Sequence, residues 1–481
     1  MIRHVIGGES VASAAGETFE TRNPHDGSLL AEVAAGTAAE ADAAVAAARE
    51  AFPVWSRMGS AERGRLMHGL ADLLEARTDE LAALETADCG KPIRQARRDI
   101  SRSALNFRFF ADHAAAVDSE TWEEGGLRTI VRYEPGGVAA CISPWNFPLM
   151  QASWKVAPAL AFGCTAVLKP AEQTPVTAER LGLLALEAGI PAGVLNVVQG
   201  FGPDSVGEAL TRHPDVDRIT FTGESRTGKA IMHAAADGLK PVSFELGGKS
   251  ANVIFADCDL DAAVPGAISG IFHNNGEVCL AGSRILVECS IHDEFVERFV
   301  AATRALRVGD PSDEATDIGP LVERPHLDKV ASYVRLGVEE GAELLHGGGA
   351  PDDPALAAGN YIEPAVFAGV ANSFRVCREE IFGPVAVIVP FEDEREAVAI
   401  ANDSPYGLAG MVWTENLRRA HRVAAAIETG MVWVNCFYER ELRAPFGGVK
   451  QSGIGREGGR HSREFFTEPK AVGMRLDERP A

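Results

Sequence analysis

One cysteine of this chain stands among residues whose types could do chemistry. Cys279 follows a polar, glycine-containing run at residues 273–278 and precedes Leu280 and the small residues 281–283. A lone cysteine is most often a small hydrophobic residue of the core. Glycines and polar residues on both sides, however, are typical of a backbone that approaches a substrate. The sequence therefore presents Cys279 as a candidate nucleophile, with a buried structural thiol as the alternative.

Two further segments carry candidate catalytic side chains. Glu245 follows the segment Val-Ser-Phe at residues 242–244 and precedes two glycines. A glutamate in an apolar setting can have a raised pKa and serve as a general base. Asn146 stands between Pro144 and Pro148, which fix the backbone around one amide and suit a held hydrogen-bond donor. A solvated loop acid and a turn cap are the alternative interpretations of these two residues.

Short apolar segments alternate with helical ones in the middle of the chain. Hydrophobic periodicity predicts strands at residues 165–168, 194–198 and 218–221, and helices at 175–189, 204–213 and 226–236. This βαβαβα order predicts an open parallel sheet with helices on both faces. In such sheets ligands bind at the carboxyl ends of the strands, where the turns 169–172, 199–202 and 222–224 lie.

Two of these turns could contact a dinucleotide. Glu172 follows Lys169 by three residues, and a carboxylate there can accept both hydroxyls of an adenosine ribose. The segment 223–228 begins and ends with glycine but is not a GxGxxG fingerprint. It suits a helix N-terminus near a pyrophosphate, or an ordinary turn with Ser225 or Thr227 near the N-cap.

The remaining predicted elements frame this region. We predict helices at residues 38–52 and over 60–85, and a β-hairpin over 128–140 that turns at 134–136. A second α/β region covers 250 to about 445, with strands at 251–255 and 385–390 and helices at 293–305 and 395–402. The tail at 465–475 reads as a strand that pairs with another segment or another subunit.

Composition excludes several classes of protein. The chain has 481 residues, of which 68 are acidic and 46 basic, and its formal charge is -22. Such a field disfavours nucleic acid and membrane surfaces as partners. The longest apolar stretch, residues 156–168, is too short to span a bilayer, and no secretion signal begins the chain. Eight cysteines without CxxC or Cys/His spacing argue against zinc and disulfides, so we expect a cytoplasmic enzyme without a metal site.

Taken together, these segments closely resemble the aldehyde dehydrogenase superfamily over nearly the whole chain. The matching motifs, in order, are 144–148 (PWNFP), 169–172 (KPAE), 221–223 (FTG), 245–249 (ELGGK), 272–284 (FHNNGEVCLAGSR), 379–384 (EEIFGP), 406–410 (YGLAG) and 445–450 (PFGGVK). The resemblance implies Cys279 as the nucleophile, Glu245 as the general base and Asn146 as the side-chain half of the oxyanion site. It also implies that NAD is bound by Ile142, Trp145, Lys169, Glu172, Gly202, Phe221, Thr222, Gly223, Glu224, Gly228, Leu246, Glu380 and Phe382.

The implied reaction is oxidation of an aldehyde to its carboxylic acid. The Cys279 thiolate would form a thiohemiacetal and then a thioester, and Glu245 would activate the water that releases the acid. Because Glu245 is present, hydrolysis is favoured over transfer to coenzyme A. Glu172 favours NAD over NADP, since a carboxylate repels a 2′-phosphate.

The resemblance also implies an architecture. It predicts an α/β fold with a Rossmann-like NAD-binding domain (1–115 and 136–247) and a catalytic domain (248–451). A small antiparallel β arm (116–135 and 452–481) would build a homodimer or homotetramer.

Two segments are similar to one branch of the superfamily. Residues 223–228 (GESRTG) and 440–450 (RELRAPFGGVK) resemble enzymes that oxidise muconic semialdehydes, although Glu224 stands where many relatives have serine. In that branch arginines grip the substrate carboxylate, which implies Arg102 and Arg443 here. The alternatives are a broad oxidiser of aromatic or betaine-type aldehydes, and a binding protein on this scaffold without turnover.

Overall fold

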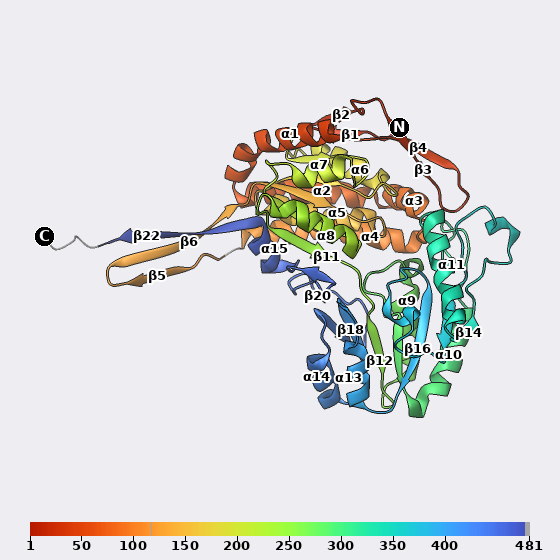
Figure 1. The fold of residues 1–481 in the computed structure, drawn as a ribbon. Helices are drawn as coiled ribbons and strands as arrows, with labels where there is room; N and C mark the ends of the chain where they lie inside the picture. The colour runs from red at the N-terminus through yellow and green to blue at the C-terminus, as the bar shows by residue number, and fades with distance from the viewer. Residues whose placement is uncertain (117, 477–481) are drawn as a thin grey trace.

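An eight-stranded sheet forms the centre of the upper body in Figure 1. The computed structural model describes residues 1–116 and 118–476. Five central strands are parallel and run in the order β9-β8-β7-β10-β11, while β1 and β21 pair antiparallel at the two sides. The strand order reverses between β7 and β10, which is where such sheets bind ligands. The strands are β1 (His4–Ile6), β2 (Glu9–Val11), β7 (Val138–Ile142), β8 (Thr165–Lys169), β9 (Leu195–Val197), β10 (Arg218–Thr222), β11 (Val242–Glu245) and β21 (Gly453–Ile454).

Helices cover both faces of this sheet, as the βαβαβα pattern predicted. The first begins with a capping box in which Thr37 and Glu40 satisfy each other's backbone N–H groups. The predicted helical region 60–85 is two helices, because the backbone leaves the helical conformation at Arg77. The helices are α1 (Ala38–Arg57), α2 (Ser60–Ala76), α3 (Thr78–Cys89), α4 (Ile93–Ala115), α5 (Pro148–Ala161), α6 (Val176–Glu187), α7 (Val206–Arg212) and α8 (Ser225–Ala236).

A seven-stranded sheet organises the lower body. Its order is β14-β15-β16-β13-β12-β18-β19, and all neighbours are parallel except β14 and β15. The strands are β12 (Ala251–Ile254), β13 (Arg284–Glu288), β14 (Glu343–His346), β15 (Ala365–Ala368), β16 (Val385–Phe391), β18 (Ala409–Trp413) and β19 (Met431–Val434). The helices are α9 (Leu260–Phe272), η1 (His273–Gly276), η2 (Cys289–Ile291), α10 (His292–Arg304), α11 (Arg324–Glu339), η3 (Pro354–Leu356), α12 (Arg375–Arg378), α13 (Glu394–Asn402) and α14 (Leu417–Ala426).

A three-stranded sheet projects from the upper body (Figure 1). It consists of β5 (Thr121–Glu124), β6 (Leu127–Pro135) and β22 (Thr467–Arg475), and β22 pairs antiparallel with β6 along its whole length. The predicted tail strand is confirmed and pairs with another segment of the same chain. Within the segment 452–481, however, β21 joins the eight-stranded sheet and α15 (Gly459–Phe466) packs on α5. Residues 117 and 477–481 of the predicted arm lie outside the described residues.

The predicted hairpin over residues 128–140 is wrong. The strands β6 and β7 belong to different sheets, and the chain passes from the arm into the upper body between them. A Cβ on Gly136 would lie 1.9 Å from the Arg218 guanidinium, and one on Gly137 (φ 97°) would lie 1.9 Å from Asp217 Oδ2. The glycines therefore allow the backbone to pass close to the side chains at the start of β10, and they do not form a hairpin turn.

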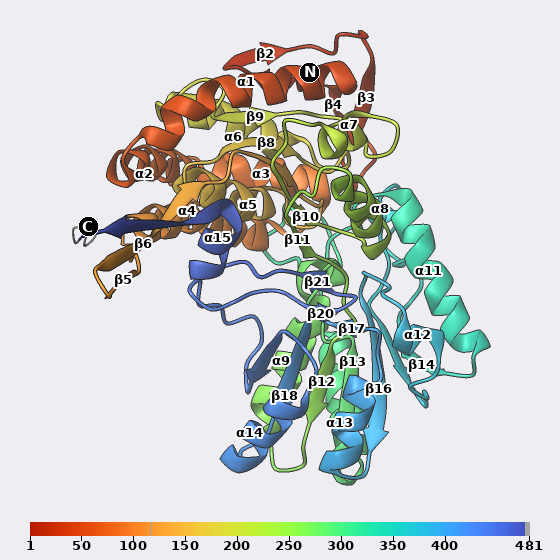
Figure 2. The same ribbon diagram turned by 60° about the vertical axis from the view of Figure 1, so that its left-hand side comes forward.

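The two bodies meet where the chain leaves β11 and enters β12. Figure 2 shows the bodies one above the other, with β20 (Val449–Lys450) and β21 in the region between them. The short strand β17 (Tyr406–Gly407) pairs with β20, and β3 (Thr18–Arg22) pairs with β4 (Leu29–Ala34). Among the described residues, no helix combines the length and apolarity needed to cross a membrane. The same residues hold no cluster of three His, Cys, Asp or Glu side chains arranged for a metal.

Candidate active site

The loop that carries Cys279 owes its path to three residues in unusual backbone conformations. After α9, Asn274 and Asn275 adopt φ angles of 49° and 58°, a region that asparagine tolerates better than most residues. The Asn275 side chain accepts a hydrogen bond from Gly319 N at 2.7 Å and donates to Pro320 O at 3.0 Å. A Cβ on Gly276 (φ 75°) would lie 2.4 Å from the Gly383 carbonyl carbon. The loop is thereby packed backbone to backbone against the segment that carries Glu380.

Cys279 is partly exposed, and acidic groups surround its thiol. Burial of the sulfur, and after it the nearby Glu380 and Glu245, raise the pKa of the Cys279 thiol to about 12. The backbone amides of Cys279 and Leu280 act in the opposite direction, because they favour the thiolate. The resting thiol is therefore protonated near neutral pH.

Glu245 ends β11, and its carboxyl group is buried. Neither of its oxygens has a hydrogen-bond partner among the described residues, and a Cβ on Gly447 would lie 2.4 Å from Oε1. Burial and then the neighbouring Glu457 raise the pKa of the Glu245 carboxyl well above its usual value, while Lys155 and Arg440 lower it. Lys155 Nζ donates to Glu457 Oε1 at 3.0 Å. An unpartnered acid with a raised pKa beside the thiol can exchange a proton with water.

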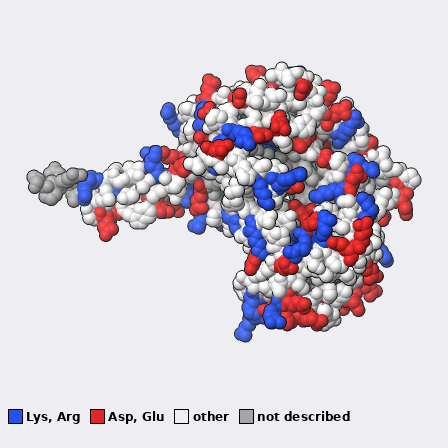
Figure 3. All heavy atoms as spheres, in the orientation of Figure 1, with Lys and Arg blue, Asp and Glu red and all other residues white. Residues whose placement is uncertain are grey.

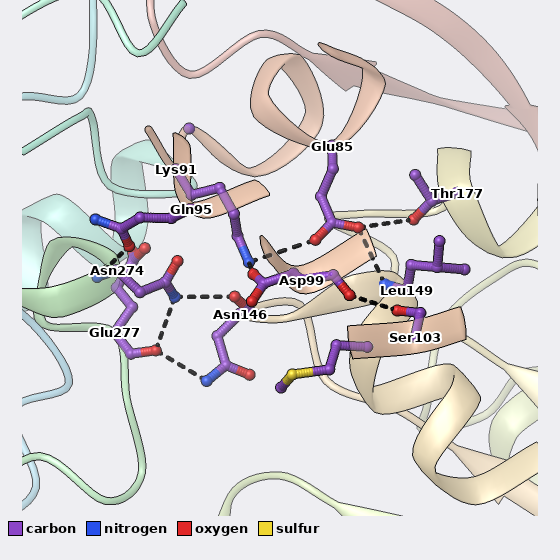
Figure 4. A network of polar contacts seen from close by, with 12 residues as sticks. Glu85, Lys91, Gln95, Asp99, Ser103, Asn146, Leu149, Thr177, Asn274 and Glu277 are labelled. Carbon is purple, nitrogen blue, oxygen red and sulfur yellow. Dashed lines mark hydrogen bonds and ion pairs between the residues drawn. The ribbon is translucent and has the colours of Figure 1, made fainter. Parts of the chain in front are cut away.

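Asn146 is held from both its amide and its carbonyl (Figure 4). Its Nδ2 donates to the backbone oxygen of Glu277 at 2.8 Å, and Asn274 Nδ2 donates to the Asn146 backbone oxygen at 2.9 Å. The amide has two hydrogens, so one remains for an oxyanion. The structure thus connects Asn146 to the Cys279 loop, as the predicted pairing requires.

A buried charge network supports this loop and the start of α5. Lys91 Nζ donates to Asp99 Oδ2 at 2.5 Å and lies 3.4 Å from Glu85 Oε1. Glu85 Oε2 accepts the Leu149 N–H at 3.1 Å, and Gln95 Oε1 accepts the Asn274 N–H at 2.8 Å. Figure 4 shows Glu85 from α3, Lys91 from the turn after it, and Gln95 and Asp99 from α4 beside Asn146. The network fixes the backbone on both sides of the Asn146 amide.

The predicted cofactor residues gather at the carboxyl ends of the strands of the upper sheet. Lys169 Nζ donates to Glu172 Oε2 at 3.2 Å at the end of β8. The Thr222 hydroxyl at the end of β10 is buried without a partner among the described residues, and Glu224 precedes α8 without a side-chain cap. These features fit a ribose and a pyrophosphate at a helix N-terminus. The others from this body are Ile142 at the end of β7, Trp145 after β7, Gly202 after β9, Phe221 on β10, Gly223 after β10, Gly228 in α8, and Leu246 after β11.

Glu380 and Phe382 approach the same region from the lower body. Glu380 Oε1 accepts the Gly248 N–H at 2.9 Å, and a Cβ on Gly247 would lie 2.1 Å from Glu380 Oε2. Only glycine at 247 therefore admits this carboxylate. The Phe382 ring stands edge-on to Trp145, with the centroids 5.2 Å apart. Figure 3 shows Lys and Arg side chains gathered around the hollow between the two bodies, despite the net charge of -22.

The arginines near the site differ in burial and in whether a carboxylate is bound to them. Arg102 and Arg440 each have a fully buried terminal nitrogen without a partner among the described residues. The Arg440 guanidinium lies 3.8 Å from the Trp154 ring centroid and 3.9 Å from that of Phe446. Arg443 is instead exposed and forms a two-pronged ion pair with Glu441, at 2.9 and 2.8 Å.

Comparison with known proteins gives the chain its family. The family model described as "Aldehyde dehydrogenase family" matches residues 11–472. The chain belongs to the aldehyde dehydrogenase family. It is 51% identical to the 2-hydroxymuconic semialdehyde dehydrogenase of Pseudomonas sp. (strain CF600), over 99% of each chain. It is 50% identical to the 5-carboxymethyl-2-hydroxymuconate semialdehyde dehydrogenase of Escherichia coli, over 96% of this chain and 98% of that one.

Among solved structures the chain is similar to PnpE from Pseudomonas sp. WBC-3. The TM-score is 0.98 and the identity 46%, over 100% of this chain and 99% of that chain. PnpE has also been solved in complex with nicotinamide adenine dinucleotide. The predicted superfamily and its fold are thus confirmed, and the chain is an aldehyde dehydrogenase.

Sequence reasoning did not select two residues of this aldehyde dehydrogenase site. Tyr438 (φ 59°) acts electrostatically with both Arg102 and Cys279, and Arg440 lies next to it. Arg440 and Arg443 stand three residues apart in one run of the sequence, and only their burial distinguishes them. The aromatic residues at 437 and 438 were the one local sign that this run enters the site.

Proposed function

We propose that this aldehyde dehydrogenase oxidises a carboxylated unsaturated semialdehyde, such as 2-hydroxymuconic semialdehyde, with NAD as the oxidant. The observation that carries the proposal is the pair Arg102 and Arg440, which surround Tyr438 near Cys279 and each have one buried terminal nitrogen without a hydrogen-bond partner among the described residues. Relatives named for hydroxymuconic semialdehydes at 51% and 48% identity support this substrate class.

Two like charges side by side favour an anionic ligand. Burial lowers the pKa of the Arg440 guanidinium, and the nearby Arg102 lowers it further. Neither shift deprotonates an arginine near neutral pH, so both charges persist. A substrate carboxylate would satisfy the buried donors in a bidentate geometry and reduce the repulsion between the guanidinium groups. The rings of Trp154 and Phe446 both contact the Arg440 guanidinium and fix its direction.

Arg443, the second arginine predicted from the sequence, has a different part in this proposal. Its guanidinium is bound by Glu441, whose pKa falls to about 2 because of that hydrogen bonding. Glu441 already neutralises the Arg443 charge, so Arg443 would attract a substrate carboxylate less strongly than Arg102 and Arg440. We therefore propose Arg102 and Arg440 as the carboxylate site, with Arg443 at its exposed margin.

The chain's own residues account for the covalent steps. The Cys279 thiol gives its proton to solvent water, and its sulfur attacks the aldehyde carbon to give a thiohemiacetal, while the free hydrogen of the Asn146 amide binds the oxyanion. One such donor is typically worth about 3–4 kcal/mol in the transition state. Bound NAD would supply the hydride acceptor, and loss of the hydride would leave a thioester on Cys279. Glu245 then takes a proton from water, and the hydroxide releases the acid and restores the thiol.

NAD is the cofactor, as the sequence predicted. We propose that Lys169 and Glu172 bind the adenosine ribose, with the α8 N-terminus at the pyrophosphate and Glu380 at the nicotinamide ribose. Glu172 is partly exposed beside Lys169, where a 2′-phosphate would meet a carboxylate. This arrangement supports NAD over NADP.

We propose that the projecting sheet of β5, β6 and β22 joins subunits into a homodimer or homotetramer. The exposed apolar side chains Trp122, Leu127 and Met474 on its strands support this role. We also propose a cytoplasmic location, which is supported by free thiols at all eight cysteines.

Steady-state NADH formation tests the substrate. We expect kcat/KM for 2-hydroxymuconic semialdehyde to exceed that for phenylacetaldehyde and for betaine aldehyde. Arg102→Gln and Arg440→Gln should each lower it by about 10- to 100-fold for the semialdehyde, since a charge-assisted hydrogen bond is worth about 1.5–3 kcal/mol. Neither variant should lower phenylacetaldehyde oxidation by more than about threefold. Equal losses on both substrates would refute the carboxylate site. Arg460→Gln, an exposed arginine of α15, is the matched control.

A further inference from the structure

We propose that His326 is a positioning residue for the nicotinamide side of the site, because it holds Phe382 in a backbone conformation that phenylalanine rarely adopts. His326 lies in the first turns of α11, in the lower body. This inference rests on the proposed NAD-dependent function, and it assigns His326 no contact with the reacting atoms.

The strained residue is Phe382. Its φ is +63°, in the left-handed region that is uncommon for bulky side chains and costly without outside support. His326 Nε2 lies 2.7 Å from the Phe382 backbone oxygen, so the imidazole N–H donates to this carbonyl. Because the bond acts on the main chain of the strained residue itself, it opposes the relaxation of the turn that follows Glu380.

Three rings transmit this restraint to the site. The His326 ring stands edge-on to Trp145, with centroids 5.1 Å apart, and lies 6.2 Å from the Phe382 ring. Trp145 precedes Asn146 in sequence, and Phe382 follows Glu380 by two residues. The ring cluster therefore joins the segment with the oxyanion amide to the segment with the ribose carboxylate.

A carboxyl group on the nucleophile loop completes the arrangement. Glu277 Oε1 accepts the Val322 N–H at 3.1 Å and lies 3.7 Å from His326 Nε2. Burial raises the pKa of Glu277 well above its usual value and lowers that of His326 to about 4. The His326 imidazole is therefore neutral at working pH, which leaves one ring hydrogen to assign. The 2.7 Å contact with the Phe382 carbonyl places that hydrogen on Nε2.

The donor requirement distinguishes positioning from simple packing. Glutamine can donate an amide hydrogen to the same carbonyl, whereas alanine and leucine cannot. If His326 only fills space, His326→Leu should function better than His326→Gln. If the hydrogen bond holds the turn, the order should be reversed.

The experiment measures NAD binding to the full-length enzyme without aldehyde, by calorimetry and by quenching of tryptophan fluorescence. We expect His326→Ala and His326→Leu to raise the Kd for NAD by about tenfold, the value of one typical hydrogen bond. His326→Gln should stay within about threefold of the parent. In steady state, KM for NAD should rise in the alanine and leucine variants while KM for the aldehyde stays unchanged.

The control is His25→Ala, which removes a histidine that stands edge-on to Tyr361 outside the ring cluster. It should leave the Kd for NAD unchanged. A Kd within twofold of the parent in folded His326→Ala, or equal Kd values for the glutamine and leucine variants, would overturn the inference. Failure of the parent enzyme to bind NAD would instead count against the proposed function. Thermal unfolding of each apo variant identifies any loss that comes from the fold alone.

Discussion

Disulfide exchange at Cys279 in the absence of cofactor gives a direct test of the site's electrostatics. With a pKa of about 12, only about one Cys279 in 10,000 is a thiolate at pH 8, against about a quarter of ordinary cysteines with a pKa near 8.5. The more basic thiolate is intrinsically faster by about 40-fold, for a Brønsted coefficient near 0.45. The net expectation is a rate about 60-fold below that of a free thiol.

The assay is stopped-flow reaction of the apoenzyme with an aromatic disulfide between pH 7 and 10. The rate at Cys279 should rise about tenfold per pH unit across this range, because the thiolate remains a minor species throughout. Cys279→Ser supplies the background from the other cysteines, notably the exposed Cys289. A Cys279 rate that levels off below pH 8, or matches a free thiol at pH 7, would show that the site stabilises the thiolate. The account of Glu245 and Glu380 as acids that oppose ionisation would then be wrong.

Three further predictions follow from the same geometry. Glu245→Gln should still release about one NADH per site in a burst but lose about 10²- to 10⁴-fold in kcat, measured by rapid mixing, because the thioester is no longer hydrolysed; a missing burst would argue against this role. The affinity for NAD should fall as pH drops through about 7, because burial raises the pKa of Glu380 to about 7 and a protonated Glu380 is a weaker hydrogen-bond acceptor for the ribose. A Kd for NAD that is constant from pH 6 to 8 would contradict this. Lys91→Met should lower the free energy of unfolding by about 3–5 kcal/mol, measured with urea, since it leaves the buried Glu85 and Asp99 without a counter-charge; a loss below about 1 kcal/mol would contradict this.

Local patterns predicted the fold well where backbone and burial act on neighbouring residues. The alternating strands and helices between residues 165 and 236 appear nearly as the periodicity requires, because each strand is buried on both faces. The turn signal at 134–136 led to the wrong prediction of a hairpin over 128–140. Glycine is required at 136 and 137 because the Arg218 and Asp217 side chains leave no room for a Cβ. These two residues are distant in sequence, so a local pattern could not predict their effect.

The candidate site could likewise be predicted only where the signal was local in sequence. Motif spacing selected Cys279, Glu245 and Asn146, and the structure brings these segments together, although their catalytic roles remain predictions. It could not separate Arg440 from Arg443, since the two share one run and differ only in which partner they meet after folding. Nor could it select His326, whose significance lies in one hydrogen bond to a strained carbonyl across 56 residues.

Glu245 and Glu380 both oppose the ionisation of the Cys279 thiol. Burial raises the pKa of Glu245, Glu277 and Glu380 alike, and Glu245 and Glu380 both raise that of the thiol. Ionisation of Glu245 or Glu380 therefore makes the ionisation of the Cys279 thiol more difficult. Attack by Cys279 and activation of water by Glu245 each need a single negative charge, and never both at once. A site that resists a second charge is suited to a reaction that uses the thiolate first and the carboxylate afterwards.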